Sequence, residues 1–122
     1  MSLNAGSYVA LLFLARDLAH RAHLRTRSYA EHVALNGFYE NIIEHADSFA
    51  EAYQGRFNEL LDIPLVDNEF EGEIADILEQ QLEMIEASRQ AIVPRSETAL
   101  QNIIDEAVAL YQSTLYKLRF LA

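Results

Sequence analysis

Apolar residues recur every three or four positions in four stretches of the chain, the pattern of helices that bury one face. The stretches predict four helices, over about 4–24, 29–54, 69–92 and 97–118. A short turn separates the first two helices, and Pro94 separates the last two. Four helices of comparable length predict an all-α four-helix bundle, formed by the whole chain, residues 1–122, as one domain.

Capping signals mark several helix ends. Ser28 and Asn68 each precede a glutamate by three residues, the spacing of a capping box at the start of a helix. Ser96 is expected to cap the fourth helix, and Gly55 to follow the end of the second. Pro64 stops any further helical turn in the long connection between the second and third helices. That connection can either cross over along the bundle or join helices wound simply up and down.

The composition narrows the class of protein. The chain has no run of 18 uncharged apolar residues, which indicates no membrane span, and its first 17 residues indicate an amphipathic helix rather than a signal peptide. It has no cysteine, so thiolate chemistry and disulfides are excluded. A net charge of −10 with a single lysine leaves no strong basic face, so DNA binding is not expected. A cytoplasmic location without a membrane partner is the expectation.

Four potential metal ligands lie in the first two helices, at His20, His32, Asp47 and Glu51, with separations of 12, 15 and 4 residues. The two histidines lie six residues on either side of Thr26, so an antiparallel hairpin places them at the same height, where they can share a cation. The two carboxylates are four residues apart and project from one helix face. Taken separately, each pair also fits an ordinary structure, hydrogen-bonded histidines or an exposed acidic patch.

The two pairs cannot reach one ion within a single chain. Asp47 lies 15 residues beyond His32, or about 22 Å along a straight helix. A two-fold dimer with its second helices antiparallel would bring the pairs together and form two identical sites. Gly37 lies close to the required axis and costs helix stability unless it permits close backbone approach. The other residues expected at the axis are Tyr39, Glu40 and Asn41.

At these residues the chain resembles the Dps-type miniferritins, the DNA-protection-during-starvation branch of the ferritin-like superfamily. All three ligand spacings match, as does the segment Asp-Ser-Phe-Ala-Glu at 47–51. The resemblance implies a ferritin-like bundle whose ferroxidase site takes His20 and His32 from one subunit and Asp47 and Glu51 from the other. It also implies iron (Fe²⁺/Fe³⁺) as the metal, with Zn²⁺ or Mn²⁺ as substitutes. The implied assembly is a homo-oligomer, a dimer through the second helix, with a larger shell left open.

Two functions follow from these observations. The leading interpretation is a Dps-like iron-binding protein that oxidises or sequesters Fe(II), and whether it is an enzyme, a ferroxidase, is left open. Asn36 stands where the family has a further carboxylate, and the candidate outer ligands are His23, Asn36 and Glu40. The alternative, which Asn36 favours, is a non-enzymatic helical oligomerisation or interaction protein that keeps the scaffold without the activity. The chain is also similar to a group of small uncharacterised phage-encoded proteins.

Overall fold

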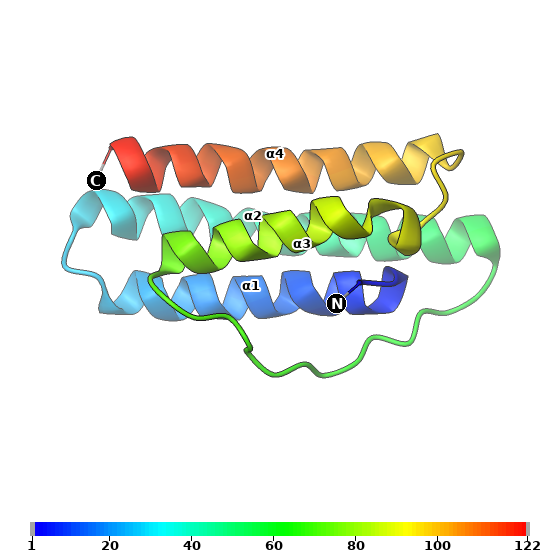
Figure 1. Cartoon of the computed structure of the whole chain (residues 1–122), viewed down its shortest axis with the longest axis horizontal. Helices are drawn as coiled ribbons and strands as arrows, with labels where there is room; N and C mark the ends of the chain where they lie inside the picture. Colours follow the sequence, from blue (N-terminus) through cyan, green and yellow to red (C-terminus); the bar gives the residue numbers. More distant parts are fainter. Residues whose placement is uncertain (1, 122) are drawn as a thin grey trace.

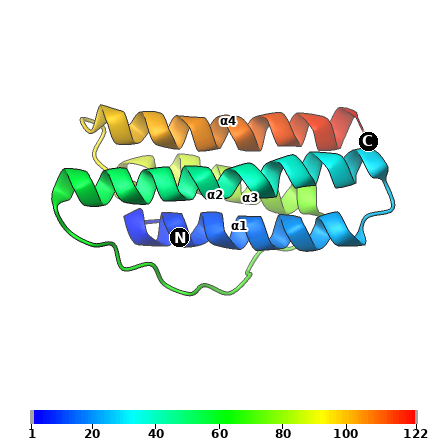
Figure 2. The ribbon, with the colours of Figure 1, turned by 180° about the vertical axis from the view of Figure 1, so that it is seen from behind.

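The computed structural model describes residues 2–121, which form four α-helices. The helices are α1 (Ala5–Arg25), α2 (Tyr29–Phe57), α3 (Ile74–Ile92) and α4 (Thr98–Phe120). They lie side by side, and α1 and α4 each pack against both α2 and α3 (Figures 1 and 2). The predicted all-α four-helix bundle is therefore confirmed.

The connection between α2 and α3 decides the topology. Residues 58–73 run back along the length of the bundle, so α3 is parallel to α2, while α1 and α4 run the opposite way (Figure 1). One long crossover of this kind is the connectivity of ferritin-like bundles, and simple up-and-down winding is excluded. The crossover passes over the α1 side of the bundle and leaves α2 uncovered when the molecule is seen from behind (Figure 2).

The starts of the first two helices have clear local causes. Asn4 and Ser7 form a reciprocal capping box, because the Asn4 side chain accepts from the Ser7 N–H and the Ser7 hydroxyl accepts from the Asn4 N–H. Ser28 caps α2, and its hydroxyl accepts from the backbone N–H of Glu31 at 3.1 Å. The predicted position of the first turn is thus confirmed, and this turn sets the relative height of α1 and α2.

The later boundaries differ from those predicted. Helix α2 continues through Gly55 to Phe57, and its C-cap is Asn58, which adopts the left-handed conformation (φ 54°) that asparagine tolerates. Helix α3 begins at Ile74 instead of just after Asn68, because the Asn68 side chain accepts from the Phe70 N–H and holds an Asx turn. Glu97, not Ser96, occupies the N-cap of α4. The capping predictions for the end of the second helix and for the starts of the third and fourth helices were therefore wrong.

Aromatic side chains fill the centre of the bundle. Tyr8 of α1 packs edge-on against Phe49 of α2 at 4.9 Å between ring centroids, and Phe38 of α2 packs in the same way against Tyr111 of α4 at 5.1 Å. The Tyr111 hydroxyl donates to the buried side-chain oxygen of Gln81 at 2.8 Å. Burial raises the pKa of both Tyr8 and Tyr111 well above the usual range, so both phenols stay protonated.

The two buried tyrosines should respond oppositely to loss of the hydroxyl. In the described residues the Tyr8 hydroxyl has no hydrogen-bond partner, so Tyr8→Phe is expected to leave the free energy of unfolding unchanged or raise it by about 1 kcal/mol. Tyr111→Phe leaves Gln81 unpaired and is expected to lower it by about 1–3 kcal/mol. Chemical denaturation of the two variants measures both effects, and equal losses would contradict the expectation.

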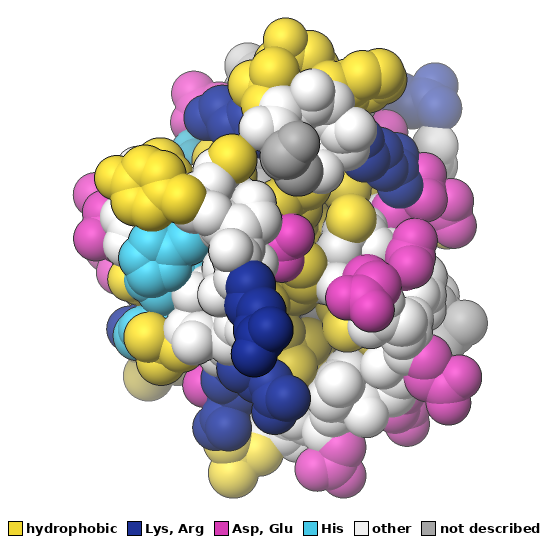
Figure 3. Space-filling model, turned by 90° about the vertical axis from the view of Figure 1, so that its left-hand side faces the viewer, with side chains coloured by type: hydrophobic (Ala, Val, Ile, Leu, Met, Phe, Trp, Pro, Cys, Tyr) yellow, Lys and Arg dark blue, Asp and Glu magenta, His cyan; other side chains and the backbone are white. Residues whose placement is uncertain are grey.

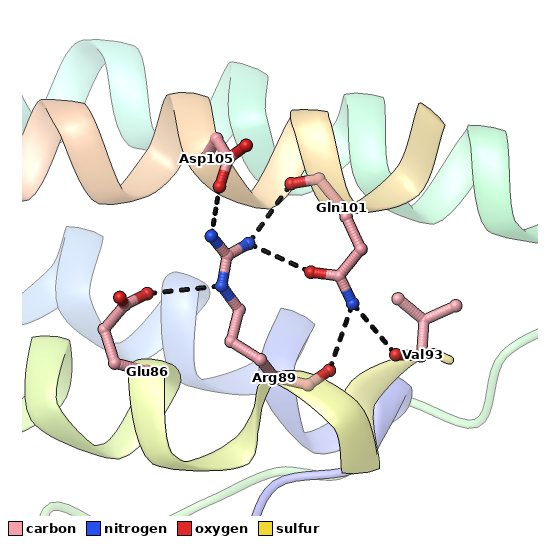
Figure 4. Close-up of polar contacts among 5 residues, drawn as sticks. All are labelled: Glu86, Arg89, Val93, Gln101 and Asp105. Carbon is pink, nitrogen blue, oxygen red and sulfur yellow. Dashed lines mark hydrogen bonds and ion pairs between the residues drawn. The ribbon is translucent and has the colours of Figure 1, made fainter. Parts of the chain in front are cut away.

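A polar network joins α3 to α4 near the turn between them (Figure 4). The Arg89 guanidinium donates to the backbone and side-chain oxygens of Gln101, both at 3.1 Å, and pairs with Asp105 and Glu86. The Gln101 amide in turn donates to the carbonyl of Val93 at 2.9 Å. Because these groups bond one another across the α3–α4 interface, we assign the network to the structure of the bundle and not to a functional site.

Candidate functional site

The predicted histidine ligands lie at one end of the bundle, where α1 ends and α2 begins. Seen end-on, histidine side chains reach the surface on one side beside arginine or lysine side chains, and acidic side chains line the other side (Figure 3). An open polar hollow lies there between the α1–α2 turn and the start of α3, lined by Arg25, Thr26, Glu31 and Glu73 among others. Basic and acidic side chains thus lie on opposite sides of this end of the molecule.

His23 and His32 bind each other across the hairpin. Their rings stack with centroids 3.6 Å apart and an interplanar angle of 18°. The Nδ1 of His23 lies 2.7 Å from the carbonyl oxygen of His32, and the Nδ1 of His32 lies 2.8 Å from the carbonyl oxygen of His23. The His23 carbonyl lies in the last turn of α1, where carbonyls lack a helical partner, so His32 satisfies an otherwise unpaired acceptor.

His20 is held by a different contact. Its ring stacks on Tyr39 with centroids 4.2 Å apart and an angle of 12°, and lies 6.0 Å from the ring of His23. The Tyr39 hydroxyl donates to the side-chain oxygen of Asn36 at 2.8 Å. We call His20, His23, His32 and Tyr39 the histidine cluster. The structure thus brings the two predicted histidine ligands into one cluster, in which His23 contacts both.

The predicted carboxylate ligands lie elsewhere. Asp47 and Glu51 are exposed on α2, and in the described residues neither makes a hydrogen bond or an ion pair. Their separation of 15 and 19 residues from His32 places them about 22–28 Å away along the helix. Among residues 2–121, no group of three or more His, Cys, Asp or Glu side chains could hold a metal ion. The four-ligand site between two chains therefore stays a prediction.

The residues predicted at a dimer axis fall into two groups. Glu40 and Asn41 are exposed, and a Cβ added at Gly37 would meet nothing within 4 Å, so no packing within the chain requires glycine there. The Asn41 side chain donates to the Gly37 carbonyl at 2.7 Å. Tyr39 differs, because it packs into the histidine cluster and not onto the open face of α2.

The predicted outer ligands are now placed as well. The Asn36 oxygen is occupied by the Tyr39 hydroxyl, and His23 is buried against His32, with 7% of its surface exposed. Glu40 lies exposed on the outer face of α2. The sequence therefore did not reveal the contact of His23, which packs against His32 from the neighbouring helix.

The fold defines the class of this protein as an all-α four-helix bundle with one long crossover. Among the described residues, no helix is both long and apolar enough to cross a membrane. Residues 23–118, most of the chain, match the family of unknown function DUF5856, so the chain belongs to that family.

One curated relative comes from a phage. Over 52 residues the chain is 36% identical to an uncharacterised 14.6 kDa protein of the mobD–ri intergenic region of Enterobacteria phage T4. The match covers 43% of this chain and 41% of the phage protein, so it spans less than half of that relative. No solved structure matches the chain. The similarity to phage-encoded proteins is confirmed, but neither match is to a ferritin or Dps-type protein, so that resemblance stays a prediction.

Proposed function

We propose that the chain forms an antiparallel two-fold dimer through α2 and binds Fe(II) at two sites shared between the subunits. Each site takes His20 and His32 from one chain and Asp47 and Glu51 from the other. One observation carries the proposal: these carboxylates are exposed on α2, have no partner among residues 2–121, and lie at the opposite end of the helix from the histidine cluster. When the α2 helices of two chains pack antiparallel, the carboxylates of one chain lie beside the histidines of the other.

The donor set fits such an ion. A carbonyl oxygen can only accept, so the Nδ1 of His32 must carry its hydrogen, and Nε2 keeps the lone pair when the ring is neutral. In the described residues His20 makes no hydrogen bond at either ring nitrogen. Two imidazole nitrogens with two carboxylates suit Fe(II), and also Mn(II) or Zn(II).

The exposed face of α2 suits a metal-dependent dimer. The crossover lies over α1 and leaves this face open, and Gly37 offers no side chain to hold a second helix away. Glu40, Glu44, Asp47 and Glu51 would bring like charges together in a dimer, which costs free energy unless cations offset the repulsion. Metal binding and dimer formation should therefore strengthen each other.

Fe(II) is substrate or cargo in this proposal. Oxidation by dioxygen or peroxide would be chemistry of the metal, and the contribution of the chain is to bind and orient the ion. Asn36 supplies no carboxylate, and its oxygen is engaged by Tyr39, which favours a site of four ligands. We therefore place binding and sequestration of Fe(II) first, and ferroxidase activity as a second step to be measured.

Anaerobic Fe(II) titration combined with sedimentation tests the function. The wild-type chain is expected to bind one ion per chain and to sediment as a dimer or a larger even-numbered assembly. Asp47→Ala should weaken binding at least about tenfold, as expected for loss of a charged ligand. Glu44→Ala removes an exposed carboxylate from the same helix face and should bind nearly as the wild type does. Tight binding by a strict monomer would contradict the proposal.

A second candidate is a non-enzymatic helical oligomer without metal. The Asn36–Tyr39 hydrogen bond favours it, because a metal ligand of the resembled family is replaced by a group with a structural role. Under this alternative the chain still assembles, but titration shows no Fe(II) binding at micromolar concentration. The same experiment therefore separates the two functions.

A further inference from the structure

We infer that His23 is a positioning residue, which holds the His32 ring so that Nε2 is the nitrogen offered to a metal ion. This inference rests on the proposed function, because it assigns a task to His23 at the same site. From the sequence alone, His23 is only a candidate outer ligand. The structure instead places it, almost fully buried, between His32 and the rest of the histidine cluster.

The hydrogen bonds fix the tautomers of both rings. Each Nδ1 faces a backbone carbonyl oxygen, at 2.7 Å for His23 and 2.8 Å for His32, and such an oxygen only accepts. Both rings therefore carry hydrogen on Nδ1, which leaves Nε2 as the lone-pair nitrogen of neutral His32. Metal-binding histidines characteristically donate their other N–H to a carbonyl or carboxylate in this way, which sets the tautomer and orients the ring.

The His23 side chain adds what the backbone cannot. The bond from His32 ends on the His23 backbone, so it could form with any residue at position 23. The His23 ring covers one face of the His32 ring at 3.6 Å and donates to the His32 carbonyl, which closes a reciprocal pair across the hairpin. Without that ring, His32 can rotate away from the His23 carbonyl and exchange tautomers.

Exposure separates the two roles. His23 keeps only 7% of its surface accessible, and the Tyr39 ring packs against it at an interplanar angle of 69°, with ring centroids 5.2 Å apart. His32 is partly exposed and borders a shallow hollow with Arg27 and Tyr29. A metal ion held at the interface with a second subunit can therefore reach His32, whereas His23 is buried on the inner side of the His32 ring.

Nitrogen-15 NMR of the imidazole rings tests the inference in the metal-free chain of 122 residues at mildly alkaline pH. Wild-type His32 is expected to show one tautomer, with hydrogen on Nδ1. His23→Phe keeps a flat ring against His32 and should preserve that tautomer, whereas His23→Ala should give a mixture. His45→Ala, which removes a histidine of α2 outside the cluster, should change neither.

Zn²⁺ titration of the same proteins supplies the second measurement. His23→Ala should weaken Zn²⁺ binding by about tenfold to a hundredfold, the loss typical when the support of a ligand is removed. His45→Ala should bind as the wild type does.

The outcomes are distinguishable. An Nε2–H tautomer of His32 in the wild type, or wild-type tautomer and affinity in His23→Ala, would overturn the inference and leave the proposed function standing. No Zn²⁺ or Fe(II) binding by the wild type would overturn the proposed function, and with it the ligand role of His32. The tautomer mixture with weakened Zn²⁺ binding in His23→Ala supports both.

Discussion

Mixing a His32→Ala chain with an Asp47→Ala chain is expected to restore tight metal binding, which each variant alone has lost. In the proposed dimer each variant by itself damages both sites, because every proposed site takes histidines from one chain and carboxylates from the other. In a mixed dimer both lesions fall in one site, and the second site is intact. Isolated mixed dimers should therefore hold half of the wild-type sites.

The control uses two lesions in the same half of the site. Mixed dimers of His20→Ala with His32→Ala carry one damaged histidine in each site, so they should recover nothing. Two affinity tags isolate the mixed dimers, and Fe(II) or Zn²⁺ titration counts the sites. No recovery with the His32 and Asp47 pair would remove the shared site, and recovery with the histidine pair would show that the ligands are not divided between chains as proposed.

The helices were predictable from the sequence wherever a local signal had no competitor. Ser28 had a short turn before it and an apolar stripe after it, and it caps α2 as expected. Asn68 carried the same signal, but its side chain could also close a turn onto Phe70, and that local bond formed instead. Gly55 keeps a helical conformation, and Asn58 takes the left-handed position three residues later, because asparagine also tolerates it.

The sequence allowed two topologies for the bundle and did not decide between them. Residues 58–73 are long enough to cross the bundle, but chain length alone did not exclude up-and-down winding. The decision depends on long-range packing, such as the close approach of the crossover to α1 at Gly6. A glycine near the start of a helix has several possible causes, so this contact could not be identified before the structure was known.

For the candidate site, the sequence predicted the position of each residue along its helix but not the contacts between the rings. Spacing placed the four candidate ligands on α1 and α2, because residue number fixes height along a helix. It did not fix which rings meet, since ring orientation depends on side-chain torsions and on unpaired carbonyls nearby. The turn at residues 26–28 is centred closer to the midpoint of His23 and His32 than to that of His20 and His32. The position of the turn was therefore the one feature of the sequence that favoured His23, and not His20, as the residue stacked on His32.

Gly6→Ala is expected to destabilise the protein, although alanine is the better helix former. A Cβ at Gly6 would overlap the backbone carbonyl oxygen of Asp62 in the crossover and lie 3.2 Å from its carbonyl carbon. Relieving this overlap requires backbone movement, which typically costs about 1–3 kcal/mol in a packed region. The helix propensity of alanine offsets about 1 kcal/mol of that cost.

Gly55→Ala is the matched control, because a Cβ there meets nothing within 4 Å. It should raise the free energy of unfolding by up to about 1 kcal/mol through helix propensity and reduced freedom of the unfolded chain. Denaturant midpoints compare the two variants, and limited proteolysis should cut residues 58–73 faster in Gly6→Ala. Equal stabilisation by both would mean that the crossover does not press on α1. The open face of α2, on which the proposed dimer depends, would then need another explanation, because the crossover would be free to lie elsewhere on the bundle.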